Sequence, residues 1–225
     1  MPLCTLHALP YRPDPTYWFE RIRHAPGAVL LDSGRPVAER GRFDLLSAWP
    51  IRVLEPSATE TGNAFFSRLR EALRSLGDAE APLDTELPFI GGLLGYLSYD
   101  FGSRLERLSN DAIDDLGLPH ARFGLYAWAL VNDHQHQTTH LVFHPSLTEA
   151  ERNRVIKVFE SDWKYSQATF SLLSAFIADL KPSEYQGAIE RIQRYIQAGD
   201  CYQVNFAQRF RANYRGDPWQ AFRLL

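Results

Sequence analysis

The sequence predicts a mixed fold in which short strands dominate and helices are dispersed between them. Short apolar runs bounded by glycine, proline or polar residues recur along the 225 residues and are typical of strands. Helix-start signals recur between these runs, at Asp14-Pro15, at Thr148 with Glu151, and at Asp217-Pro218. The clearest alternation of apolar and polar residues, GDCYQVNFAQRF at 199–210, indicates a half-buried strand.

The N-terminal part is expected to combine one helix with strands. Asp14 can cap a helix and Pro15 suits its first position, and Pro26-Gly27 is expected to end it. Strands are expected at 28–31, 45–49 and 51–54, the first of them buried. The loop at 34–41, GRPVAERG, is polar and rich in turn residues, which is typical of a connection between strands.

A second helix and a glycine-rich strand are expected next. Asn63 is a suitable cap for a helix that runs to Leu76, and Gly77 follows its end. The apolar side of this helix is formed by Phe65, Phe66, Leu69, Leu73 and Leu76. After an acidic loop at 79–87, the apolar run at 89–100 predicts a strand. Its glycines indicate a bulge or the close approach of another backbone, and their G-G-x-x-G spacing does not fit a dinucleotide-binding loop.

Residues 123–131 and 138–143 predict a β-hairpin with its turn at 132–136. Five histidines lie in or near this hairpin and raise the possibility of a metal site: His120, His134, His136, His140 and His144. No carboxylate or cysteine converges on them in a ligand pattern. Exposed hairpin histidines are therefore the favoured interpretation.

The remaining part of the chain is expected to hold two longer helices and two strands. A capping box at 148–151 predicts a helix to about Trp163, and residues 170–176 are expected to form a strand. A second capping box at 183–186 is expected to open a helix that Gly199 ends. The strand predicted at 199–210 comes directly after that helix.

This last strand has two different faces. Its apolar face is formed by Tyr202, Val204, Phe206 and Phe210, and its polar face by Cys201, Gln203, Asn205 and Arg209. One interpretation is a half-buried strand with a solvated outer face. The other is a binding surface, because Gln203 and Asn205 are short amides that both donate and accept hydrogen bonds.

The end of the sequence suggests a longer protein. Asp217-Pro218 signals a helix start, yet only WQAFRLL follows. An isolated helix shorter than about 12–15 residues is marginal in water. We therefore expect this chain to be the N-terminal piece of a longer polypeptide.

Composition excludes several classes of protein. The net charge is -3 and no segment collects Lys and Arg, so nucleic acid is not an expected partner. Cys4 and Cys201 are far apart and form no CxxC motif, which argues against a zinc site and a disulfide framework. Neither a signal peptide nor an apolar run of about 20 residues is present, so a soluble, cytoplasmic protein without membrane contact is predicted.

Three stretches together resemble the chorismate-utilising enzyme family. They are LLDSGRPVAERGRFDLL at 30–46, LPFIGGLLGYLSYDFG at 87–102 and AGDCYQVNFAQRF at 198–210. The resemblance spans essentially the whole chain in order. Tyr202 and Asn205 resemble the aminodeoxychorismate synthase component I branch, whereas anthranilate synthases tend to carry Phe and an apolar residue at these positions.

The resemblance implies a large α+β fold with antiparallel β-sheets packed face to face and flanking helices, truncated here. It divides the chain into an N-terminal domain, 1–180, and the start of the chorismate-binding catalytic domain, 181–225. The implied reaction converts chorismate and ammonia to 4-amino-4-deoxychorismate, for 4-aminobenzoate and folate synthesis. A glutamine amidotransferase subunit (component II) supplies the ammonia, and Mg²⁺ holds the chorismate carboxylate. The family's lysine, general acid and metal-ligating glutamates are expected beyond Leu225, so the chain alone is expected to be inactive.

The residues that can be carried over belong to binding sites. Family members bind tryptophan at positions that match Ser33, Arg40, Gly41, Arg42 and Phe43, and Gln203 and Asn205 are expected near the edge of the chorismate pocket. The alternative for the first group is a loop in which Arg42 pairs with Asp44 or a nearby acid. For the whole protein, the alternatives are anthranilate synthase component I and a non-catalytic module that binds an amino acid or the amidotransferase.

Overall fold

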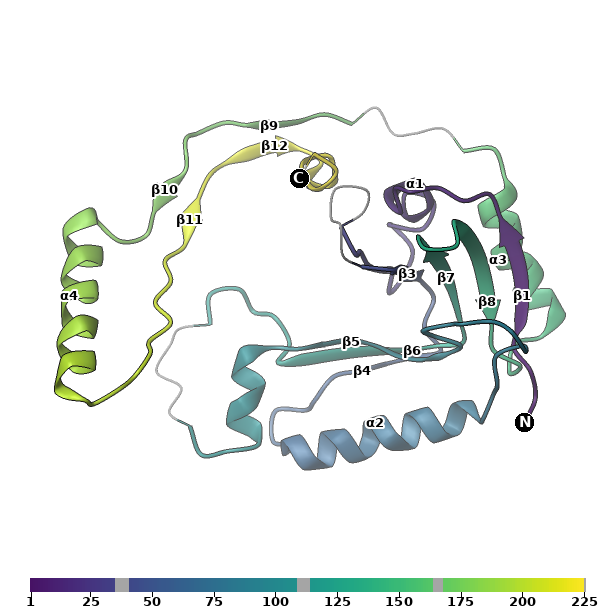
Figure 1. Ribbon diagram of the computed structural model, residues 1–225, viewed down its shortest axis with the longest axis horizontal. Coiled ribbons are helices and arrows are strands. Elements are labelled where there is room, and N and C mark those ends of the chain that lie inside the picture. Colours follow the sequence, from purple (N-terminus) through teal and green to yellow (C-terminus); the bar gives the residue numbers. More distant parts are fainter. Residues whose placement is uncertain (35–40, 109–113, 164–167, 225) are drawn as a thin grey trace. The chain divides into compact units, whose positions relative to one another are not determined.

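The computed structural model describes residues 1–34, 41–108, 114–163 and 168–224 (Figure 1). It divides into two compact units, unit 1 at Met1–Lys164 and unit 2 at Tyr165–Leu225. The family-based domain boundary at 180/181 lies within unit 2 and stays a prediction. No helix in the described ranges has both the length and the apolar character needed to cross a lipid bilayer.

The larger sheet of unit 1 has five strands in the order β1-β8-β7-β3-β2, and all its neighbouring strands are antiparallel. The strands are β1 (Thr5–Leu9), β2 (Val29–Leu31), β3 (Phe43–Ser47), β7 (Trp128–Asp133) and β8 (Thr138–Phe143). Helices α1 (Thr16–Phe19) and α3 (Glu149–Glu160) cover one face (Figure 1). The core between them contains Trp18, Leu46, Trp128, Phe143 and Phe159. Strand β1 was not predicted, and β2 is a partly exposed edge strand instead of a buried one.

The smaller sheet of unit 1 has three antiparallel strands in the order β4-β6-β5. They are β4 (Arg52–Leu54), β5 (Gly92–Leu97) and β6 (Ala121–Tyr126). Helix α2 (Gly62–Leu76) packs against them through Phe65, Leu69 and Leu76, and the short 3-10 helix η1 (Tyr99–Arg104) follows β5. The α+β class with antiparallel sheets and flanking helices is therefore confirmed.

The strand predicted at 123–131 is in fact divided between the two sheets. Strand β6 ends at Tyr126 in the smaller sheet, and β7 begins at Trp128 in the larger one. The run FGLYAWALV is apolar on both sides of this break. A continuous apolar run carries no periodicity that could reveal a change of sheet.

Helix α1 is much shorter than predicted. Asp14 accepts a hydrogen bond from the backbone N–H of Thr16, but Pro15 is the N-cap residue instead of the first helical residue, and the helix ends at Phe19. The N–H groups of Ile22 and Ala25 then bond to carbonyls three residues back, so the chain continues as tighter turns. This conformation buries Ile22 in the core of the larger sheet.

The caps of the other helices were predicted with mixed success. The capping box of Thr148 and Glu151 is confirmed, although α3 ends at Glu160 instead of Trp163. Thr61 caps α2, not Asn63. In unit 2, α4 (Pro182–Ala198) begins after Lys181, because Pro182 takes the first helical position, so the predicted box at 183–186 is wrong. Gly199 ends α4 in the left-handed conformation, as predicted.

Unit 2 also contains two short antiparallel ribbons and a terminal helix. Its ribbons pair β9 (Phe170–Leu172) with β12 (Tyr214–Gly216) and β10 (Ile177–Ala178) with β11 (Phe210–Arg211), and α5 is Pro218–Phe222. The strand predicted at 170–176 thus ends early. The strand predicted at 199–210 is wrong except for Phe210, and Tyr202 is 97% exposed. A strand requires a hydrogen-bonding neighbour, and in the described structure no strand pairs with 201–208, while the Arg209 carbonyl accepts from the Asp179 N–H at 2.9 Å beside β11.

Candidate functional site

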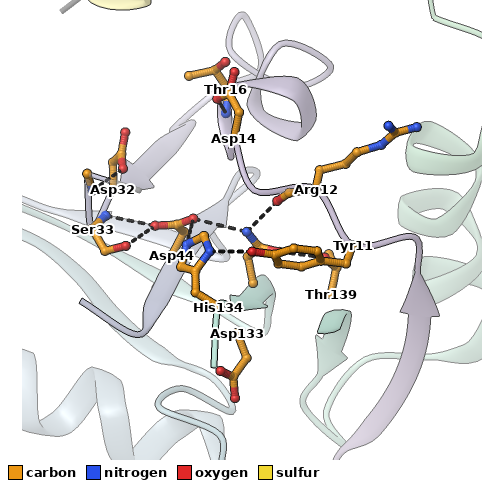
Figure 2. A network of polar contacts seen from close by, with 12 residues as sticks. Tyr11, Arg12, Asp14, Thr16, Asp32, Ser33, Asp44, Asp133, His134 and Thr139 are labelled. Atoms are coloured by element: carbon orange, nitrogen blue, oxygen red, sulfur yellow. Dashed lines mark hydrogen bonds and ion pairs between the residues drawn. The ribbon is translucent and has the colours of Figure 1, made fainter. Parts of the chain in front are cut away.

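A buried carboxylate, that of Asp44 in β3, lies at the centre of a polar network in unit 1 (Figure 2). Its Oδ1 accepts hydrogen bonds from the backbone N–H of Ser33 at 2.9 Å and from the Ser33 hydroxyl at 2.7 Å. Its Oδ2 accepts from His134 Nε2 at 2.6 Å and from Asn132 Nδ2 at 3.2 Å. A buried charge is tolerated only when it is hydrogen-bonded in this way.

Strand register explains why these groups meet. Asp44 pairs with Asn132 across β3 and β7, and Asn132 pairs with Thr139 across β7 and β8. The Thr139 hydroxyl donates to Asn132 Oδ1 at 2.6 Å, and Asn132 Nδ2 donates to the Arg12 carbonyl at 2.8 Å. The polar residues therefore form one row across three strands, on the same face of the sheet as Leu46 and the apolar core.

The side chain of His134 joins the hairpin to the N-terminal segment. An ionised carboxylate can only accept, so Nε2 carries the proton donated to Asp44. In the neutral ring, Nδ1 then accepts from the Tyr11 hydroxyl at 2.9 Å (Figure 2). Tyr11, Ser33, Asp44, Asn132, His134 and Thr139 are called the Asp44 network below.

The interpretation of the hairpin histidines as exposed is wrong for two of them. The side chain of His134 is only 4% exposed, and His144 is also buried. His136 does stay exposed. The sequence pattern placed His134 in the turn. It could not show that the imidazole ring bonds to a carboxylate on another strand, that of Asp44, and is buried for that reason. The signal that was missed is a polar residue inside each of two apolar strands, Asp44 and Asn132.

A second polar cluster lies on the opposite face of β3. Arg42 forms ion pairs with Asp133, at 2.9 Å between Nη2 and Oδ2, and with Glu86, and its guanidinium lies 4.5 Å from the centre of the Phe43 ring. Burial by itself raises the pKa of the Asp133 carboxyl. Hydrogen bonds from Arg42, from His136 and from the backbone outweigh that effect and lower the pKa to about 2. Arg42 thus pairs with nearby acids, although not with Asp44.

The structure separates the residues predicted to bind tryptophan. Ser33 and Gly41 lie together, since a Cβ on Gly41 would be 2.7 Å from the Ser33 Cβ, and both lie beside Asp44. Arg42 and Phe43 lie with the other cluster, where Phe43 lines a cavity of about 570 Å³. Arg40 is outside the described residues.

Gln203 and Asn205, predicted near the chorismate pocket, are exposed in unit 2. They bond to each other at 3.3 Å, from Gln203 Nε2 to Asn205 Oδ1. Nothing in unit 2 tests their predicted role, which stays a prediction.

The Asp44 network is arranged for holding groups in place and not for nucleophilic catalysis. In a Ser-His-Asp triad the histidine lies between the serine and the carboxylate and takes the serine proton. Here the Ser33 hydroxyl donates directly to Asp44, and His134 bonds to the other carboxylate oxygen. Within the described ranges, no group of three or more His, Cys, Asp or Glu side chains could hold a metal ion. The network instead fixes the start of the β2–β3 loop.

The fold and this site define the class of protein: an α+β domain with antiparallel sheets and a buried polar network that positions a loop. The family model described as "chorismate binding enzyme" matches residues 28–225, and the chain belongs to that family.

Individual relatives carry more specific names. Aminodeoxychorismate synthase component 1 of Salmonella typhimurium is 37% identical over 98% of this chain, and that of Escherichia coli is 35% identical over 92%. Anthranilate synthase component 1 of Mycobacterium tuberculosis is 27% identical over 89%. The chain spans about half the length of these relatives, 50%, 47% and 44% respectively.

The fold is also similar to a solved structure. Anthranilate synthase component I from Streptococcus pneumoniae superposes with a TM-score of 0.59 at 24% identity. The match covers 86% of this chain and 48% of that one. At this level of identity the similarity supports the fold, and the antiparallel arrangement that the sequence resemblance implied is confirmed.

Proposed function

We propose that this chain is part of an aminodeoxychorismate synthase component I, which converts chorismate and ammonia to 4-amino-4-deoxychorismate. The observation that carries the proposal is the 37% identity over 98% of the chain to a relative of that name. The mycobacterial relatives named anthranilate synthase component 1 are 27% identical. A glutamine amidotransferase is the proposed source of ammonia, and the product would serve 4-aminobenzoate and folate synthesis.

The described residues do not supply the metal chemistry of this reaction. Mg²⁺ prefers carboxylate and water oxygens in an octahedral arrangement. The buried carboxylate of Asp44 is fully occupied by hydrogen bonds, and that of Asp133 by Arg42 and His136. No step is therefore assigned to a metal held by these residues. Units 1 and 2 are proposed to provide the scaffold, and the reacting groups are expected elsewhere in the full-length protein.

Product analysis tests the proposal. The protein at the length of its relatives, given chorismate, ammonium and Mg²⁺, is expected to form 4-amino-4-deoxychorismate, detected by mass spectrometry after chromatography. The 225-residue chain alone is expected to show no turnover above the buffer control. Formation of anthranilate instead would overturn the assignment to aminodeoxychorismate synthase and support anthranilate synthase. Absence of turnover by the longer protein, with an amino acid still bound, would favour a non-catalytic module.

We further propose that the corner at Ser33, Gly41 and Asp44 contributes to an amino-acid site, with tryptophan as the first candidate ligand. The Ser33 oxygen keeps a lone pair free to accept from an ammonium group, and the Asp44 carboxylate behind it favours positive charge.

Titration calorimetry with tryptophan checks this site in the longer protein. Ser33→Ala is expected to weaken binding about tenfold, the effect of one hydrogen bond to a charged group. Ser103→Ala is the matched control, because that exposed hydroxyl bonds only to the Asp100 carbonyl. Absence of heat in the wild-type protein, or equal effects of both variants, would contradict the proposal.

A further inference from the structure

A cavity of about 390 Å³ in unit 1 lies between two tryptophans and helix α3, away from the Asp44 network. Its apolar walls are Trp49, Trp128, Leu147, Val155 and Val158. Arg154 and Glu151, also on α3, are its charged lining residues. Small-molecule sites commonly have volumes of about 300–1,000 Å³, mostly apolar walls and a few polar groups.

The conformation of Trp49 is costly and demands an explanation. Its φ is 54°, a left-handed conformation that is a true outlier for a bulky residue and is energetically unfavourable. Trp49 also remains 41% exposed, so this conformation does not bury the residue completely and part of it stays accessible to a ligand. Glycine or asparagine would meet the backbone requirement more cheaply.

The surrounding corner fixes this conformation. The Trp49 N–H donates to the Pro26 carbonyl at 2.8 Å, and the ring of Pro50 packs so closely on Gly27 that a Cβ there would lie 2.5 Å from it. Gly27 is held in turn by the Tyr126 hydroxyl, which donates to its carbonyl at 2.7 Å. The corner therefore aims the indole of Trp49 in a fixed direction.

The second indole is fixed as well. The Trp128 indole N–H donates to the Ala48 carbonyl at 3.0 Å, and its ring meets Phe159 edge to face at 5.8 Å. The centres of the Trp49 and Trp128 rings are 5.9 Å apart, at a tilt of 32°. Two preorganised aromatic rings thus form one wall of the cavity, and the aliphatic side chains of α3 form another.

The two charged residues that line the cavity, Glu151 and Arg154, differ in their hydrogen bonds. Glu151 Oε2 accepts from the Thr148 hydroxyl at 2.7 Å and from its N–H at 2.8 Å, and these bonds lower the pKa of Glu151. Arg154 interacts electrostatically with Glu151, but in the described part of the chain its guanidinium makes no hydrogen bond. Its N–H donors remain available to a planar carboxylate, which guanidinium binds in a bidentate manner.

We propose that this cavity binds a small planar aromatic carboxylate. The ligand ring lies against the indole of Trp49 and the aliphatic side chains of α3, and its carboxylate pairs with Arg154. Aromatic stacking adds to the favourable burial of the ligand ring, and the charged hydrogen bonds orient the ligand. This site is independent of chorismate conversion and of the amino-acid site at Ser33.

Titration of the 225-residue chain with benzoate, followed by tryptophan fluorescence and calorimetry, tests the proposal. Saturable binding is expected, and Trp49→Gly and Arg154→Gln are each expected to weaken it at least about tenfold. Glycine suits a φ of 54°, so Trp49→Gly removes the ring without disturbing the corner. The expected thermal midpoint of this variant is equal to or above that of the wild type.

Two controls and two further probes sharpen the result. Trp163→Phe alters another half-exposed tryptophan, and Lys157→Gln removes another cation from α3, and both should bind benzoate within about twofold of wild type. Benzyl alcohol lacks the carboxylate and cyclohexanecarboxylate lacks the aromatic ring, so each should bind more weakly. The proposal is overturned if benzoate does not saturate the wild-type chain, or if Trp49→Gly or Arg154→Gln binds it unchanged.

Discussion

Replacing Asp44 with alanine is expected to lower the free energy of unfolding of unit 1 by about 3–5 kcal/mol, the usual effect of removing one partner of a buried charged pair. The carboxylate is fully buried and accepts four hydrogen bonds. Its removal leaves His134 Nε2 and the Ser33 N–H without this acceptor, while Asn132 Nδ2 keeps its bond to the Arg12 carbonyl. Each such orphaned group adds a desolvation penalty of about 1–3 kcal/mol.

Urea unfolding followed by tryptophan fluorescence measures this effect. A Trp219→Phe background places all remaining tryptophans in unit 1, so the signal reports that unit. Asp32→Ala is the matched control, because among the described residues this exposed carboxylate in the same loop accepts one hydrogen bond, from the exposed Gly34 N–H at 2.7 Å. It should change stability by less than about 1 kcal/mol. Equal midpoints for the two variants would show that the Asp44 network does not stabilise unit 1.

Replacing Gly95 with alanine is expected to destabilise unit 1 by about 3 kcal/mol, at the upper end of overpacking effects. A Cβ at this position would lie 2.1 Å from the Arg122 carbonyl oxygen and 2.7 Å from the Phe123 Cα. Both atoms belong to the backbone of β6, so no side chain can move aside. Strands β5 and β6 would have to separate, which breaks the hydrogen bonds at the centre of the smaller sheet.

Gly102→Ala is the matched control for this prediction. It lies in η1 of the same unit, and its new Cβ would make only an ordinary contact of 3.6 Å with Leu108. The same urea assay should show a change of less than about 0.5 kcal/mol. A midpoint for Gly95→Ala as high as that of Gly102→Ala would mean that the β5–β6 pair accommodates a side chain at this position.

Local chemistry allowed several elements to be predicted from sequence. The capping box at Thr148 and Glu151, the left-handed Gly199 after α4 and the side-chain cap by Asp217 are all present. Each depends on residues within one helical turn, so the sequence carries the complete signal. The close backbone approach indicated by the glycines at 89–100 is likewise present at Gly95.

Long-range pairing accounts for the predictions that were wrong. The alternation at 199–210 was real, but no strand of the described structure pairs with 201–208, so this segment does not become a strand. His134 was placed correctly in its turn, yet its burial depends on Asp44, which is far away in sequence. A short stretch of sequence contains neither the pairing partner of a strand nor the distant residue that buries a side chain.

By itself, the sequence determined the class of fold, the family and the N-terminal caps of α3 and α5, because these depend on composition, motifs and neighbouring residues. Only the tertiary structure decided that Asp44, Ser33 and His134 form one network, and that Ser33 and Phe43 lie on opposite sides of β3. It also decided that Trp49 lies beside Trp128 in one wall of a cavity. The physical reason is that strand register and chain corners set the direction of each side chain, and both depend on contacts between residues distant in sequence.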